Sequence, residues 1–259
     1  METAKNTIDK KSSQNGGGWA RRAAVLVFWI ALWQLTAMAI NKGLLFAGPW
    51  DTLKALAALI PQKSFWYTIA FSTLRIGGGF LMAFFASVVL GAGAYRFRWV
   101  EELLAPVIML AKSVPVASFI ILALVWIGSR NLSVFVSFVI VLPVLYLQVL
   151  QGLRQCSGEL LEMAQVFGMS TGKKIWYLYL HSLKPFLLAG CQMSLGMCWK
   201  AGTAAEVIGA TQNSIGGQLY MAKIYLDTTD LFAWTFVIII LSYVFEAVCM
   251  KGLRAILRT

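Results

Sequence analysis

The residues of this chain that could do chemistry are few and widely spaced. Its 259 residues include one histidine, His181, and four cysteines, none of which forms a CxxC pair. This set predicts neither a zinc site nor a disulfide framework, and buried thiols within helices are the simpler interpretation. No Gly-rich phosphate loop followed by Lys and Ser or Thr occurs, so we do not expect the chain to bind ATP in that way.

Charged residues inside strongly apolar runs form a second group of candidates. Charge within a membrane-spanning segment is costly, which makes a functional role the first hypothesis. Lys112, Lys200 and Glu206 stand inside such runs, Lys112 close to Pro115 and Lys200 next to Trp199. These five residues are the candidates for a translocation path under the family resemblance described below. Lys200 could attract an anion there. The alternative is that the lysines snorkel to the membrane surface or pair with another helix.

The composition predicts an all-α membrane protein. Hydrophobic residues make up 59% of the chain and charged residues 13%, with a mean hydropathy of +0.73. Soluble domains carry roughly a quarter charged residues, so we expect the lipid bilayer to serve as part of the solvent. The net charge is +11. Because the basic residues stand in short groups between apolar runs, we do not expect nucleic acid as a partner.

Six apolar runs are long enough to cross a bilayer, which takes about 20 residues of helix. We predict spans at about 23–40, 65–95, 103–127, 132–150, 186–208 and 231–250. Six spans place both termini on one side of the membrane. Fourteen of the 22 basic residues fall on that side and five on the other, which predicts cytoplasmic termini.

The segment between the fourth and fifth expected spans is the most informative. Ser157 can cap a helix whose first turns carry Glu159 and Glu162. Leu160, Ala164 and Phe167 share one face of that helix, and Gly168 can end it in a left-handed turn. A second helix, capped by Ser170 or Thr171, is expected to run to about Leu183. This hairpin suits docking to a partner, and an interfacial helix lying on the membrane is the alternative.

The same segment resembles the EAA loop of binding-protein-dependent ABC importer permeases. The resemblance is carried by Glu162-Met163-Ala164, by Gly168 six positions after the Glu, and by Leu178-Tyr179-Leu180. Met163 replaces an Ala of the family pattern, Leu178 replaces an Ile, and His181 stands where a Pro is expected.

Further motifs, in the same order and spacing, are similar to the nitrate/sulfonate/taurine branch of that family. They are Ser72-Thr-Leu-Arg75 with Gly79-Phe80, Pro106 with Lys112-Ser-Val-Pro115, Leu124-Val-Trp126-Ile-Gly128, and Leu195-Gly-Met-Cys-Trp199 with Ala205-Glu206. Pro185 matches a second proline common in the branch. The resemblance covers the chain from about Pro49 to its end.

The resemblance implies a type I ABC importer permease fold with about six transmembrane helices and a cytoplasmic coupling-helix hairpin. It implies a non-catalytic subunit in a bacterial cell membrane, with ATP bound by a separate ATP-binding subunit. The other implied partners are an extracytoplasmic solute-binding protein and a second permease copy. The coupling residues implied by position are Glu162, Met163, Ala164, Phe167, Gly168 and Thr171. The solute would be a small nitrate-, sulfonate- or taurine-like anion or a related small organic molecule.

This interpretation divides the chain into three parts. Residues 1–18 form a flexible cytoplasmic tail, residues 19–64 hold the first transmembrane helix and an extracytoplasmic interfacial segment, and residues 65–259 form the permease domain with the EAA-like loop at about 157–183. A secondary transporter or channel without an ATPase is the alternative, but no internal inverted repeat is evident. A membrane-embedded enzyme is a third alternative. It would need clustered His, Asp, Glu or Cys residues, and the single histidine of this chain argues against it.

Overall fold

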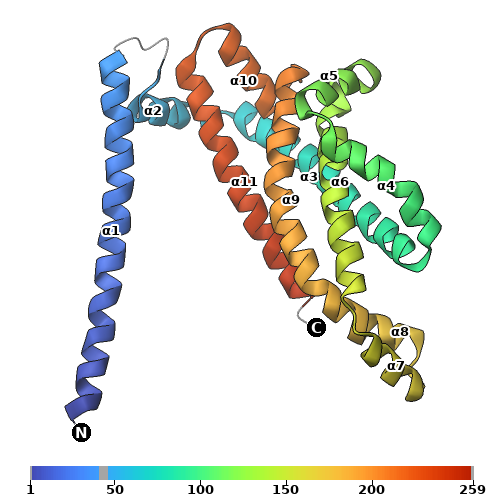
Figure 1. Cartoon of the computed structure of the whole chain (residues 1–259). Coiled ribbons are helices and arrows are strands. Elements are labelled where there is room, and N and C mark those ends of the chain that lie inside the picture. The colour runs from blue at the N-terminus through green and yellow to red at the C-terminus, as the bar shows by residue number, and fades with distance from the viewer. Residues whose placement is uncertain (1, 41–45, 258–259) are drawn as a thin grey trace. The chain divides into compact units, whose positions relative to one another are not determined.

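The computed structural model describes residues 2–40 and 46–257, and for residues 2–20 it describes the backbone alone. Residues 1, 41–45 and 258–259, which belong to the three expected parts of the chain, lie outside the described residues. Within the described ranges every regular element is a helix (Figure 1). The predicted all-α class is therefore confirmed.

The chain forms two compact units, one of Met1–Pro61 with Ala222–Ala233 and one of Gln62–Met221 with Trp234–Thr259. The smaller unit contains α1 (Glu2–Ile40) and α2 (Pro49–Leu59). Within it, the Trp33 indole donates to the Ala47 carbonyl at 3.1 Å, and its ring lies 5.7 Å from that of Phe232. The backbone of residues 2–18, expected as a flexible tail, continues α1 as helix, because extending a formed helix is far easier than starting one.

The larger unit holds the remaining helices. They are α3 (Lys63–Arg96), α4 (Arg98–Ser113), α5 (Val116–Ile127), α6 (Ser129–Arg154), α7 (Gly158–Val166), α8 (Thr171–Lys174), the π-helix η1 (Ile175–Tyr179) and α9 (Leu180–Ile208). The last two helices, α10 (Ile215–Ile224) and α11 (Thr228–Ile256), have residues in both units. α6 packs along both α3 and α9 (Figure 1).

Four helices of the described chain are long and apolar enough to cross a membrane: Arg21–Ile40, Lys63–Arg96, Ser129–Arg154 and Thr228–Ile256. The α4–α5 pair would make a fifth span. α9 was expected as a span but is not among them, although it runs for 29 residues. Gln192, Lys200 and Glu206 interrupt its apolar sequence.

The expected third span, about 103–127, is not one straight helix. α4 and α5 meet at an angle of 109°. The break falls at Val114 and Pro115, which both have extended backbone conformations. Proline lacks an N–H and forces the preceding residue out of the helical region, so the helix ends there. Pro106, by contrast, lies inside α4 without ending it.

Glycines allow α3, α6 and α9 to approach one another closely. A side chain at Gly79 of α3 would lie 2.5 Å from the Val134 carbonyl oxygen of α6. A side chain at Gly202 of α9 would lie 2.7 Å from both Ile76 and Ser137. Small residues at such crossings let helix backbones pack tightly where lipid provides no hydrophobic driving force between helices.

Gly79→Ala should therefore destabilise the protein. The new methyl group would meet a backbone atom that cannot move aside, and overpacking of this kind costs about 1–3 kcal/mol. Gly78→Ala is the matched control, because a side chain there has no neighbour within 4 Å. Thermal unfolding of both variants in detergent tests this, and equal midpoints for the two would contradict the packing described here.

Candidate functional site

The α7–α8 hairpin follows the end of α6 that lies away from α5 (Figure 1). α6 has 26 residues and is therefore about 39 Å long. Two interactions hold the legs of the hairpin to the α3–α4 corner. Arg154, which ends α6, forms an ion pair with Glu101, and the Tyr179 and Tyr95 hydroxyls lie 3.5 Å apart. The segments that precede and follow the hairpin therefore both contact this corner.

The turn after α7 has a defined geometry. Gly168 has a φ of 63°, the left-handed conformation that favours glycine. The Met169 N–H donates to the Ala164 carbonyl at 2.9 Å, and the Gly168 N–H donates to the Gln165 carbonyl at 3.0 Å. This pair of bonds defines a Schellman motif, which satisfies carbonyls at a helix end. The prediction that Gly168 ends the helix in a left-handed turn is confirmed.

An apolar surface is exposed on α7 and its turn. Val166 is 85% exposed and Phe167 78% exposed, and Leu160 and Met163 are also exposed. Ala164 was expected on the same stripe as Leu160 and Phe167, but it is only 2% exposed. The chain folds back toward Ala164 at the turn, where the Met169 N–H donates to its carbonyl. Val166 was not predicted, although it lies three residues after Met163, the spacing of neighbours on a helix face.

The polar residues predicted for the hairpin are also on its surface. Glu162, Gly168 and Thr171 are exposed. Ser157 and Ser170 occupy the positions before α7 and α8 as expected, but neither side chain makes a capping hydrogen bond. The second helix does not stop near Leu183, since α8, η1 and α9 follow one another without a gap. Pro185, two residues after Leu183, lies inside α9 without ending it.

The residues predicted for a translocation path fall into two groups. Lys112, Pro115 and Lys200 are exposed. Trp199 is buried and packs edge-on against Phe245, with ring centroids 5.8 Å apart. Glu206 is also fully buried. Their part in a path stays a prediction, but in this conformation Trp199 and Glu206 face neighbouring helices.

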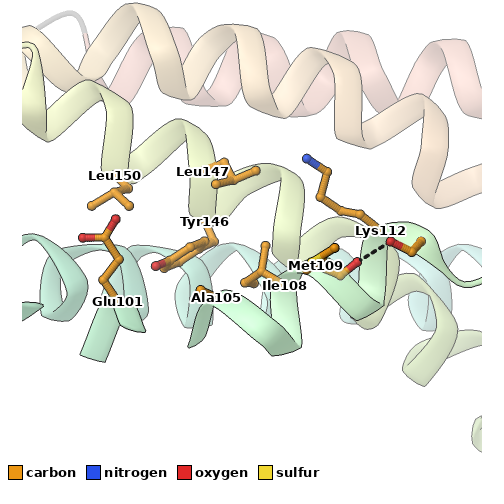
Figure 2. A pocket seen from close by; sticks show the side chains of 9 residues that line it. Glu101, Ala105, Ile108, Met109, Lys112, Tyr146, Leu147 and Leu150 are labelled. Carbon is orange, nitrogen blue, oxygen red and sulfur yellow. Dashed lines mark hydrogen bonds between the residues drawn. The ribbon is translucent and has the colours of Figure 1, made fainter. Parts of the chain in front are cut away.

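Lys112 borders a cavity of about 410 Å³ between α4 and α6. Figure 2 shows Tyr146 and Leu147 of α6 opposite Ala105 and Ile108 of α4. Glu101 lies at the other end of the α4 wall from Lys112. The buried Tyr146 hydroxyl has no hydrogen-bond partner among the described residues. The cavity therefore joins apolar walls to charged and polar groups, an arrangement typical of small-molecule sites.

Glu206 holds three segments together inside the larger unit. Its Oε2 atom accepts hydrogen bonds from the Ser72 hydroxyl at 2.8 Å and from the Gly216 N–H at 3.1 Å. The Ser72 oxygen in turn accepts from the Ile215 N–H at 2.9 Å. Glu206 thus links the end of α9 to α3 and to the first turn of α10, whose positive helix end favours a carboxylate.

The connection from α9 to α10 fits tightly around this carboxylate. A side chain at Gly216 would lie 2.3 Å from Glu206 Cβ, and one at Gly217 would lie 2.0 Å from the Thr211 carbonyl oxygen. Ala210 and Asn213 have positive φ angles of 44° and 56°. The sequence alone gave no partner for Glu206, because Ser72 lies 134 residues away in the chain.

The sequence of the larger unit matches a known family over most of its length. Residues 76–258 match the family described as the binding-protein-dependent transport system inner membrane component. The chain belongs to this family. It is a permease component of an ABC transport system, as the resemblance of the EAA-like loop predicted.

Several named permeases are similar to this chain. The taurine transport system permease protein TauC of Escherichia coli is 26% identical over 91% of this chain and 85% of its own length. The putative aliphatic sulfonates transport permease protein SsuC of Bacillus subtilis is 23% identical over 90% of this chain and 84% of its own. The bicarbonate transport system permease protein CmpB of Synechococcus elongatus is 24% identical over 67% and 66%.

Two substitutions of Glu206 distinguish the stability that its hydrogen bonds provide from the stability that its charge provides. Glu206→Ala should destabilise the protein, since each buried polar group that loses its partner costs about 1–3 kcal/mol. Glu206→Gln should be far milder, because the amide oxygen can still accept from Ser72 and Gly216. The thermal unfolding midpoints of both variants in detergent test this. Glu159→Ala is the control, because Glu159 is exposed. If Glu206→Gln is as damaging as Glu206→Ala, the charge itself is required and the hydrogen-bond account is wrong.

Proposed function

We propose that this permease receives force from a separate ATP-binding subunit through its α7–α8 hairpin. The observation that carries the proposal is the apolar surface on α7, with Val166 and Phe167 largely exposed. Amphipathic helices bind partner proteins by laying such residues into a groove. The Schellman turn at Gly168 gives this surface a fixed shape, so a movement of the partner would be transmitted and not absorbed.

Binding of the same helix to the membrane surface is the competing explanation. Helices that lie on membranes usually carry Lys and Arg on their polar face. α7 carries Glu159 and Glu162 and no basic residue, and cytoplasmic leaflets are negatively charged. The charge of α7 therefore favours a protein partner, with Glu162 available to pair with a basic group.

The distribution of basic residues supports an orientation with both termini and the hairpin in the cytoplasm. Arg96, Arg98 and Arg154 lie at the hairpin end of the larger unit, and Lys173 and Lys174 lie within α8. In this orientation Ser129, at the other end of α6, lies on the extracytoplasmic side. A solute-binding protein would deliver its cargo there.

The solute itself is proposed from chemistry and from the names of relatives. Permeases named for taurine, aliphatic sulfonates and bicarbonate are similar to this chain, so a small anion of this kind is the proposed cargo. Lys112, in the α4–α6 cavity, and Lys200 would supply positive charge along the path. A second permease copy would complete the path.

The proposed cycle uses rigid parts. Closure of two ATP-binding subunits would move the docked hairpins, and the continuous α8–η1–α9 helix would carry that movement into the membrane. Access to the path would then alternate between the two sides of the membrane. ATP would be bound and hydrolysed by the partner, and this chain would contribute no catalytic residue.

Disulfide crosslinking tests the docking proposal. Val166→Cys, in a chain that also carries Cys156→Ser, should crosslink to cysteines placed in the groove of the copurified ATP-binding subunit, because Val166 is exposed on the proposed contact. Lys63→Cys in the same background is the control, since Lys63 is exposed at the start of α3. The proposal fails if Val166→Cys gives no more crosslinked product than Lys63→Cys.

Substitution of Gly168 tests whether the shape of the turn matters. A side chain at Gly168 has no neighbour within 4 Å, so only the positive φ opposes one, and that conformation costs an L-residue about 1–2 kcal/mol. Gly168→Val should reduce copurification of the ATP-binding subunit, whereas Gly168→Asn should retain it because Asn tolerates this conformation. Gly172→Ala is the control, as Gly172 has open space and no positive φ. Equal copurification by Gly168→Val and Gly172→Ala would count against a rigid docking surface.

A further inference from the structure

A second cavity lies at the end of α6 that is away from the hairpin. It has a volume of about 400 Å³ and is lined by residues from the start of α3, the start of α6 and the turn after α9. The lining includes Arg130, Gln212, Asn213 and Phe71. Among the described residues that line it, none carries a carboxylate. Its size is at the small end of the range for small-molecule sites.

One guanidinium group lines this cavity and a second lies against Phe71, one of its lining residues. Arg130 is part of the lining. Arg75 stacks on the Phe71 ring, with its Cζ atom 4.4 Å from the ring centroid, and its Nη2 donates to the Asn131 side chain at 3.3 Å. The buried Nη1 atom of Arg75 has no hydrogen-bond partner among the described residues. Arg75 thus retains unused donors beside a wall of the cavity.

The positive charge at this place is incompletely balanced. Arg75 and Arg130 are close enough for their charges to interact unfavourably. Glu206 is the carboxylate whose charge reaches Arg75, so one buried carboxylate faces two guanidinium groups, and none of the described lining residues supplies a second. A second negative group on the open side of the guanidinium groups would reduce their mutual repulsion. Gln212 and Asn213 add amide donors from the turn.

We propose that this cavity binds a small oxyanion, such as a sulfonate, carboxylate or bicarbonate, with Arg130 as the main charged contact and Arg75 behind it. Planar guanidinium groups match the spacing of two oxygens on such a head group. The inference rests on the proposed function for its role, because this end would be where a delivered solute first meets the permease. The cavity lies at the opposite end of α6 from both the hairpin and Glu101 of the α4–α6 cavity.

Saturation-transfer difference NMR with methanesulfonate tests the proposal directly. The full-length chain is placed in phosphatidylcholine nanodiscs, and dimethyl sulfone serves as an uncharged probe of similar shape. Methanesulfonate should give the stronger signal. Arg130→Gln should weaken its binding about tenfold, since a hydrogen-bonded charge is lost, and Arg130→Lys should retain part of it.

Arg96→Gln is the matched control, because it removes the same type of exposed charge at the other end of α3. The proposal is overturned if Arg96→Gln weakens binding as much as Arg130→Gln, or if dimethyl sulfone binds as well as methanesulfonate. It is also overturned if the signal disappears when phosphatidylglycerol is added, which would assign the site to a lipid head group. No ATP-binding subunit is needed, so a failure of hairpin docking and a failure of this site give separate results.

Discussion

The close approach of α6 to α3 and α9 is the constraint on which the larger unit depends. In lipid, apolar side chains gain little by leaving the solvent, so tight van der Waals contact has to hold the helices together. Gly79 and Gly202 permit this contact, because any side chain at either position would overlap a neighbour. The positions of the hairpin at one end of α6 and of the cavity lined by Arg130 at the other both follow from this packed arrangement.

Buried polar groups are the second determinant of the structure. Glu206 lies deep among apolar helices, where an unpaired carboxylate would be very unfavourable. Ser72 and the Gly216 N–H provide its hydrogen bonds, and glycines at 216 and 217 let the chain turn closely around it. The turn between α9 and α10, which lies between Glu206 and Gly216 in the chain, contributes Gln212 and Asn213 to the cavity lined by Arg130.

The bend between α4 and α5 shows why hydropathy alone does not predict the course of the backbone. Residues 103–127 are apolar throughout most of their length, and hydropathy alone predicts one straight span. Pro115 ends the first helix, and the two parts diverge by 109°. The angle depends on what α5 packs against, namely Leu132 and Val136 of α6 and Ala201 and Ala205 of α9, which no local sequence pattern reveals.

The sequence by itself determined the class of the protein, the approximate positions of most apolar helices, and the first helix of the hairpin with its glycine turn. These features depend on composition, on periodicity and on motifs within a few residues, as at Glu162 and Gly168. Tertiary structure alone decided that Ala164 is buried while Phe167 is exposed, that Glu206 bonds to Ser72, and that Arg75 and Arg130 lie near one cavity. The last two outcomes join segments far apart in the chain, and only the packing of helices brings such segments together.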